Sequence, residues 1–412
     1  MLKTYLDVNR RYSNGKVTLV GRLAENHSGI YFQYNEEYLA THSKSISPFA
    51  IKLTNRLQRM DNLYIGNLQG VFADCLPDGW GLHLLKRQME LNKQPLNALS
   101  HLEHLAMIGN RTSGALFFEP SIPQPEPQEI NLYELGAAAL KEFEGIDTPE
   151  LPQLITAIGA KGEIPKLNVT IKPDGTYTTD PLAEGTPVIF KLSSDKFAYG
   201  HDEILIEWIY LEMAREAGIE VPDFDLIPMN TGHYWLQLKR FDCNRGTGRF
   251  HMLSASDLFN TPVHALNLDY QDLIKVSYEL CGIQAARQML RRALINFLAL
   301  NHNDHGRSFA FLADDNDKWR LSPQCGLNFT PFLSGHSTTF IGHRDKIPKK
   351  VLDTLSKQAG LSGYKNGKQI AEEVYETLRT FRRRAKVIWL DKDITKTIQQ
   401  EIDKKWKILT SY

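Results

Sequence analysis

Ala293-Leu-Ile-Asn-Phe-Leu-Ala-Leu300 runs directly into Asn301-His-Asn-Asp-His-Gly-Arg-Ser308, so an apolar helix gives way to a dense polar loop. Three interpretations of this loop compete. It can be a catalytic loop with Asp304 as a general base, a metal site through His302 and His305, or a hydrogen-bonded structural turn. The histidine spacing permits metal binding, but the sequence offers no second ligand pair. From these residues alone, the structural turn ranks first.

Length and composition indicate an ordinary globular protein of two or three domains. The 412 residues are 42% hydrophobic and 23% charged, and 48 basic residues balance 48 acidic ones. A balanced charge gives no field that would attract nucleic acid or an anionic membrane. The longest apolar run, 293–300, is too short to span a bilayer. We therefore expect a cytoplasmic protein that binds neither nucleic acid directly nor a membrane. Four widely spaced cysteines are expected to be free thiols.

The order of local patterns places a β-rich half before a helical half. Residues 1–118 mix short alternating segments with helical spacing, which predicts a small α+β unit. Four prolines within Glu119–Gln128 favour an extended linker. Strands are predicted at 166–171 and 188–192, a helix at 202–217, and a hairpin from 224–229 and 234–241. Helices dominate from residue 252, interrupted by β-like segments at 309–312 and 319–321.

The first candidate site is Lys191, which ends the apolar strand Val188-Ile-Phe-Lys191, together with Glu207 on the next predicted helix. A lysine so placed can hold nucleotide phosphates while a helix carboxylate fixes its ammonium by a charge-assisted hydrogen bond. A lysine at a strand end is more often a solvated surface residue. The pattern alone favours that simpler interpretation.

The second candidate is the turn Gly159-Ala-Lys-Gly162-Glu-Ile-Pro-Lys166, which precedes a predicted strand. Glycines allow backbone amides to approach an anion closely, so the turn can cover phosphates. It lacks the spacing of a Walker P-loop. An ordinary surface turn is again the more frequent explanation of such a pattern.

In their order along the chain, these segments resemble the HipA family of bacterial Ser/Thr kinase toxins. The resemblance covers nearly the whole chain and implies an α+β, protein-kinase-like, two-lobed fold. It implies an amino-terminal subdomain at 1–120, a β-rich lobe at 121–240 and an all-helical lobe at 241–412. The segments that carry it are Gly70–Gly81, Ile108–Ala115, Pro165-Lys166, Val188–Lys191, Glu207, Ala214–Pro222, Lys239–Asp242, Arg249–Ser254 and the region 301–328.

The catalytic region departs from the family pattern at decisive positions. Asn303 and Ser308 stand where the family has a catalytic aspartate and a magnesium-binding asparagine, and Gly326 stands where it has a metal-binding aspartate. Gly159 occupies the place of an autophosphorylated serine. Asp304 and His305 persist from the family's loop. The resemblance further implies that nucleotide-binding positions are Lys191, Glu207, Gln237, Lys239, Gly159 and Gly162, with Gln237–Lys239 as a hinge.

Phosphoryl transfer depends on positioning and on metal-assisted charge stabilisation. We therefore expect a pseudokinase of a toxin-antitoxin type system that binds a protein partner, such as a HipB-like DNA-binding antitoxin. ATP is the expected nucleotide, and Ser308 and Gly326 predict that no magnesium is held at the family's position. Two alternatives stay open. One is an active kinase or nucleotidyl transferase that uses Asp304 in a shifted loop, and the other is a nucleotide-free interaction scaffold.

Overall fold

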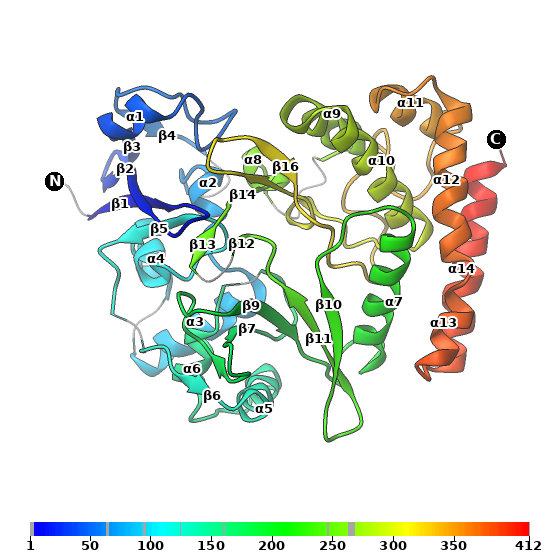
Figure 1. The fold of residues 1–412 in the computed structure, drawn as a ribbon, viewed down its shortest axis with the longest axis horizontal. Coiled ribbons are helices and arrows are strands. Elements are labelled where there is room, and N and C mark those ends of the chain that lie inside the picture. The colour runs from blue at the N-terminus through cyan, green and yellow to red at the C-terminus, as the bar shows by residue number, and fades with distance from the viewer. Residues whose placement is uncertain are drawn as a thin grey trace.

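The computed structural model describes residues 4–62, 66–93, 96–123, 125–159, 161–244, 247–262 and 268–411. Figure 1 shows an amino-terminal sheet at one end, a second sheet in the middle, and a layer of helices at the carboxyl end. Ala160 of the glycine turn and Gln124 of the predicted linker lie outside the described residues. The domain boundaries at residues 120 and 240 stay predictions.

The amino-terminal unit is an antiparallel five-stranded sheet in the order β4-β3-β2-β1-β5. Alternate residues of its strands, such as Leu6 and Val8, are buried in the main core, as the period of two along a strand requires. Its elements are β1 (Thr4–Arg11), β2 (Val17–Asn26), β3 (Gly29–Tyr34), α1 (Glu36–Thr41), β4 (Gln58–Met60), α2 (Gly70–Ala73), α3 (Gly79–Leu91), α4 (His101–Ile108) and β5 (Leu116–Glu119), with a 3-10 turn at Leu96–Ala98.

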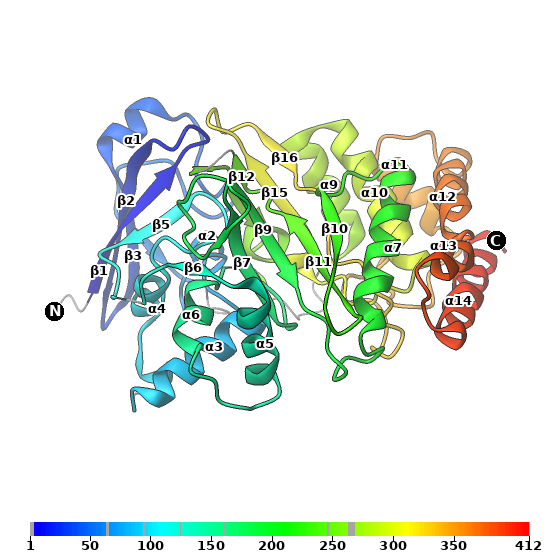
Figure 2. The same ribbon diagram turned by 60° about the horizontal axis from the view of Figure 1, so that its bottom comes forward.

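The middle sheet has the order β10-β11-β9-β7-β8-β6. Both faces are covered: Val188 and Phe190 of β9 join the core cluster of α3, α5 and α6, whereas Ile189 packs against the core that includes α7. Figure 2 shows α5 and α6 on one side of β7 and β9. The elements are β6 (Glu129–Ile130), α5 (Leu132–Phe143), α6 (Leu151–Thr156), β7 (Lys166–Ile171), β8 (Tyr177–Thr178), β9 (Thr186–Lys191), α7 (Asp202–Glu216), β10 (Phe224–Pro228) and β11 (Tyr234–Lys239).

The carboxyl half is built around α10, whose buried residues include Leu294, Phe297 and Leu298. Figure 1 shows α12, α13 and α14 forming its outer layer. The elements are β12 (Cys243–Asn244), β13 (Gly248–Arg249), β14 (His251–Ser254), α8 (Ala255–Leu258), α9 (Tyr270–Cys281), α10 (Ile283–Leu298), a 3-10 turn at Gly306–Ser308, β15 (Ala310–Ala313), β16 (Trp319–Leu321), α11 (Val351–Gln358), α12 (Tyr364–Leu378), α13 (Phe381–Val387) and α14 (Lys392–Thr410).

The carboxyl half is not helical throughout, which corrects the expected all-helical lobe. A three-stranded sheet, β14-β15-β16, lies beside the helices. The sequence indicated the β-like segments at 309–312 and 319–321, but β14 reaches β15 from 56 or more residues earlier, pairing His251 with Ala313 and Ser254 with Ala310. The turn after β15 is tied to the amino-terminal sheet, because buried Arg10 pairs with Asp317 at 2.5 Å.

Most predicted elements of the middle of the chain are confirmed. The helix expected at 202–217 is α7, which ends before Gly218 at φ 77°, and the expected hairpin is β10 and β11. All four cysteines are free. In the part of the chain that the structure describes, no helix is both long and apolar enough to cross a membrane.

Candidate phosphotransfer site

Lys191 and Glu207 form a buried ion pair where the end of β9 faces α7. The Lys191 ammonium lies 2.5 Å from the Glu207 carboxylate, and Glu207 is 1% exposed. Burial by itself lowers the pKa of Lys191, but the neighbouring groups, led by the carboxylate of Glu207, together outweigh it, so this pKa is raised. The lysine is therefore a fixed, charged group, not a solvated strand end.

The same carboxylate also holds Gly326. The backbone N–H of Gly326 donates to Glu207 Oε1 at 3.1 Å, which joins Gly326 to the ion pair. Gly326 has φ 70°, and a Cβ placed there would meet open space. The space beside the ion pair at residue 326 is thus free of neighbouring protein atoms.

The glycine turn is closed by a carboxylate of the amino-terminal unit. Gly162 has φ 111° and its N–H donates to Asp78 Oδ1 at 2.7 Å, while its carbonyl accepts from the N–H of Trp80 at 3.0 Å. The carbonyl of Gly159, at φ 153°, accepts from Ser113 Oγ at 2.7 Å. An anion is already bound to the Gly162 amide, and it is the protein's own Asp78.

Two cations near the glycine turn form ion pairs with carboxylates. Lys161 pairs with buried Asp74. Arg307, from the polar loop, lies 2.6 Å from Asp78 and 3.1 Å from Asp257. Lys161 thus joins the end of α2 to the glycine turn. Arg307 joins the 301–308 loop to the start of α3, 229 residues earlier in the sequence, and to α8.

Lys166 stands apart from these pairs. Its ammonium donates to the carbonyl of Lys161, and the side chain is buried. Burial, with the nearby charge of Lys191 adding to it, lowers the pKa of Lys166 to about 8. Lys166 is the cation at this site whose charge is least compensated by a contacting carboxylate.

The polar loop places Asn303 at the surface and Asp304 in the interior. Asn303 is exposed, and its carbonyl accepts a hydrogen bond from Ser308 Oγ at 3.1 Å. Ser308 Oγ also lies 3.4 Å from Nδ1 of His305. Neither Asn303 nor Ser308 supplies a carboxylate.

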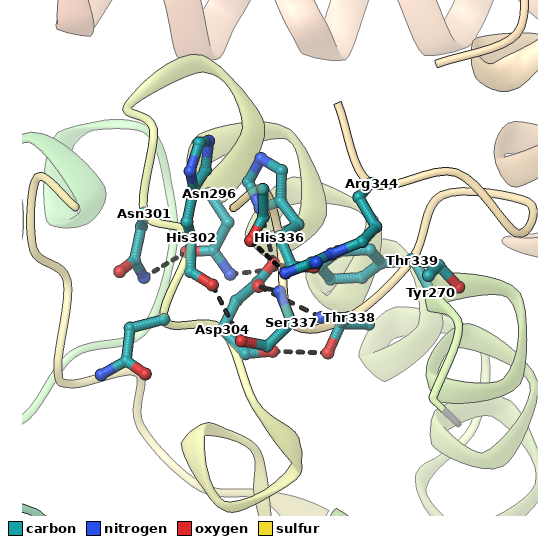
Figure 3. Close-up of polar contacts among 12 residues, drawn as sticks. Tyr270, Asn296, Asn301, His302, Asp304, His336, Ser337, Thr338, Thr339 and Arg344 are labelled. Atoms are coloured by element: carbon teal, nitrogen blue, oxygen red, sulfur yellow. Dashed lines mark hydrogen bonds and ion pairs between the residues drawn. The ribbon is translucent and has the colours of Figure 1, made fainter. Parts of the chain in front are cut away.

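Asp304 is 0% exposed and fully occupied with hydrogen bonds (Figure 3). One oxygen accepts from the hydroxyl of Tyr270 at 2.6 Å and from Nδ1 of His336 at 2.9 Å. The other accepts from the backbone N–H groups of Ser337 at 2.8 Å and Thr338 at 3.2 Å. This geometry disfavours Asp304 as a general base, because its lone pairs face the interior.

The expected hinge residues lie within the middle sheet. Gln237 stands opposite Asp225 on one side and Phe190 on the other. The backbone N–H of Lys239 donates to the carbonyl of Asp223 at 2.8 Å. An adenine contact through this N–H would require that hydrogen bond to break.

The histidine pair considered as one possible metal site in the polar loop, His302 with His305, is not seen as a contact among the described residues. His302 contacts His336 instead of His305, with ring centroids 4.6 Å apart. Sequence patterns missed the residues that close the site, namely Asp74, Asp78, Lys161, Asp257, Arg307 and His336. Asp74 and Asp78 do lie in the segment Gly70–Gly81 that carries the family resemblance, so that segment was the available signal.

A β-sheet lobe with a lysine–glutamate pair, followed by a mainly helical lobe that carries a polar loop after α10, defines the protein-kinase-like class. Within that class the chain belongs to the HipA family. The family model described as the HipA-like C-terminal domain matches residues 158–385, more than half of the chain, and the HipA N-terminal domain model matches residues 14–119.

A solved HipA structure agrees with this chain at the level of the fold. HipA of Shewanella oneidensis MR-1, solved in a toxin-antitoxin complex with HipB and operator DNA, aligns with 17% identity and a TM-score of 0.69. The alignment covers 99% of this chain and 97% of that one. The proinflammatory kinase CtkA of Helicobacter pylori aligns with 10% identity and a TM-score of 0.38, over 53% of this chain and 86% of that one. No curated protein matches the chain.

Proposed function

We propose that this HipA-family protein is a pseudokinase of a toxin-antitoxin type system, which acts by binding and not by magnesium-dependent phosphotransfer. One observation carries the proposal: Asn303, Ser308 and Gly326 supply no carboxylate, and the adjacent Asp304 is buried under four hydrogen bonds. Losing one electrostatic contact to a transition state can raise a barrier by roughly 3 kcal/mol. Losses at several such positions remove most of what a kinase contributes.

The residues fit a nucleotide only in part. Lys191, fixed by Glu207, supports an anchor for phosphates of ATP. The amides of Gly162 and Lys239 are already engaged. A magnesium ion held in the family's way does not fit, because Gly326 has no side chain and Ser308 offers only a hydroxyl that already donates to Asn303. We therefore propose weak ATP binding without the metal.

A HipB-like antitoxin is the partner that we propose. The support is family membership together with the Shewanella HipA structure, which contains HipB and operator DNA. Contact with DNA would then come through the partner, in keeping with the balanced charge of this chain. Copurification with the product of a neighbouring antitoxin-like reading frame would support this part, and failure of the pair to associate would contradict it.

The test of the pseudokinase proposal is a phosphotransfer assay with radiolabelled ATP, magnesium and the purified full chain. We expect no labelling of the protein or of added protein substrates above the level of a Lys191→Ala variant. Labelling that disappears in Lys191→Ala would overturn the proposal. A Lys275→Ala variant, altered at an exposed lysine of α9, controls for general effects of losing a lysine.

The alternative enzyme that uses Asp304 has its own test. Such an enzyme needs this carboxylate in the cleft, whereas the geometry assigns it to holding Tyr270 and His336. We expect Asp304→Asn to leave any residual turnover unchanged per folded molecule while it lowers the free energy of unfolding by at least about 2 kcal/mol, since a buried donor loses its acceptor. Loss of turnover at full stability would favour the enzyme.

A further inference from the structure

A cluster of three metal-ligating side chains includes His302 of the polar loop. One ring nitrogen of His302, one ring nitrogen of His336 and a carboxylate oxygen of Asp345 all lie within 4.8 Å of one another. Figure 3 shows the two histidine rings side by side above Asp304. His302 is 4% exposed and His336 is 0% exposed.

The hydrogen bonds of the two rings fix which nitrogen carries the proton. Nδ1 of His336 lies 2.9 Å from the carboxylate of Asp304, and Nδ1 of His302 lies 3.2 Å from the carbonyl oxygen of Leu333. Both partners are acceptors, so each Nδ1 must be the donor. Each Nε2 then presents a lone pair toward the cluster. A carboxylate or carbonyl behind a histidine is the usual support of a metal-binding imidazole.

These lone pairs lack partners. Among the described residues, neither Nε2 atom makes a hydrogen bond. Nε2 of His302 lies 3.4 Å from Asp345 Oδ1, and with Nδ1 as the donor it offers that carboxylate a lone pair instead of a proton. Buried acceptors are normally satisfied, so the two buried Nε2 atoms call for a donor or a cation. The half-exposed Asp345 oxygen already accepts from Lys405 at 3.4 Å.

The surrounding loop is held in position for such a cation. Arg344, next to Asp345, donates through Nε to the carbonyl of His336 at 2.8 Å and through Nη2 to the carbonyl of Gly335 at 2.8 Å. Lys405 of α14 lies 3.4 Å from the same Asp345 oxygen. The Lys405 ammonium also lies 4.9 Å from the ring centre of Phe297. Because it already contacts Asp345, it is a cation that would compete with a metal ion for this carboxylate.

We propose that His302, His336 and Asp345 form a zinc site, with solvent as a fourth ligand. Two imidazoles and one carboxylate are a ligand set that zinc accepts in tetrahedral geometry. In a tetrahedral zinc site with metal–ligand bonds of about 2.0–2.2 Å, two ligand atoms lie roughly 3.4 Å apart. Nε2 of His302 and Oδ1 of Asp345 already lie at that separation. The ligand atom of His336 lies within 4.8 Å of the other two, and the half-exposed Asp345 is the member that can move to close the site.

The site gives Asp304 a role that does not depend on catalysis. Its carboxylate orients His336, and the metal would tie the 301–308 loop to the 333–345 segment. Asp304 is thus a positioning residue of this site. The inference rests on the histidine geometry and holds whether or not the protein transfers phosphate.

The test is metal binding by the purified full chain with any histidine tag removed. After treatment with a chelator, zinc is titrated in competition with a chromophoric chelator, and cobalt is titrated by its visible absorption. We expect one equivalent of either metal, a cobalt spectrum of tetrahedral or five-coordinate type, and a Tm raised by several degrees with zinc. Absence of a one-equivalent site would overturn the proposal.

Variants locate the site. Asp345→Asn, at a half-exposed position, is expected to weaken zinc binding at least tenfold while leaving the fold intact, and His302→Gln is expected to abolish it. Lys405→Met removes the competing ammonium and is expected to tighten zinc binding. The matched control is His305→Gln, in the same loop but outside the cluster. We expect this variant to leave zinc binding unchanged. Full zinc binding by both Asp345→Asn and His302→Gln would contradict the assignment.

Discussion

The carboxylate of Asp78 accepts a hydrogen bond from the backbone N–H of Gly162 at 2.7 Å, across 84 residues of sequence. The left-handed backbone of Gly162 aims its amide at an anion, as glycine turns that bind phosphates do. Here the anion is a side chain, and it is held on its other oxygen by Arg307 at 2.6 Å. The Gly162 amide is therefore already hydrogen-bonded to a side chain of the protein itself. A phosphate that bound this turn would have to compete with the Asp78 carboxylate for that amide.

Asp78→Asn is expected to strengthen binding of a non-hydrolysable ATP analogue. The amide oxygen can still accept from Gly162, but the negative charge that repels phosphates is gone. We expect the affinity measured by calorimetry to rise about tenfold, which corresponds to about 1.4 kcal/mol. Asp147→Asn is the control, because Asp147 is exposed and pairs with Arg87 at the surface. An unchanged or weaker affinity in Asp78→Asn would show that Asp78 does not compete.

Lys191→Met is expected to destabilise the fold as well as to remove a nucleotide anchor. It leaves the Glu207 carboxylate buried without its cation, which costs about 3–5 kcal/mol in such pairs. Denaturant unfolding should show this loss, and the double variant with Glu207→Gln should recover part of it. Lys239→Met, at an exposed ion pair, should change stability little. A stable single variant would mean that Glu207 finds water or another partner.

Magnesium binding should be absent from the natural chain and restorable. In the Ser308→Asn, Gly326→Asp double variant, the side chain at 326 enters open space, and aspartate tolerates a φ of 70° better than most residues. We expect millimolar magnesium to raise the Tm of this variant by several degrees and to leave the natural protein unchanged. Gly326→Ala carries the same backbone strain without a ligand, so it should not respond. A magnesium-dependent Tm in the natural protein would contradict the proposed loss of the metal.

The sequence predicted the strand that ends at Lys191 and the helix that carries Glu207, and the structure has both elements. The local pattern by itself favoured a solvated lysine; the family resemblance implied a role for Lys191 together with Glu207, and the two side chains lie 2.5 Å apart. The resemblance also related Asn303, Ser308 and Gly326 to the family's catalytic and metal-binding positions. Of these three, Gly326 contacts the pair, through the hydrogen bond from its N–H to Glu207.

What the sequence could not supply are contacts between distant segments. Asp304 is an acidic loop residue in the sequence, yet its four donors come from Tyr270 and from 336–338, more than thirty residues away on either side. His302 and His305 suggested a pair by spacing, but the loop turns them to different neighbours, and His336 arrives from outside the local window. Burial and hydrogen bonding in the folded chain decided both outcomes.

Nucleotide binding should weaken above about pH 8 because of Lys166. A bound phosphate favours the charged ammonium and so raises its pKa above the value of about 8 in the free protein. Affinity for the ATP analogue is then constant below the pKa of Lys166 in the free protein. Above that pKa the affinity falls by up to tenfold per pH unit, until the pH reaches the higher pKa of Lys166 in the complex. Calorimetry between pH 7.5 and about 9.5 measures this slope. Lys166→Met should bind more weakly at low pH and lose the slope, while Lys275→Met, at an exposed lysine of α9, should keep it. A slope that persists in Lys166→Met would assign the titration to another group.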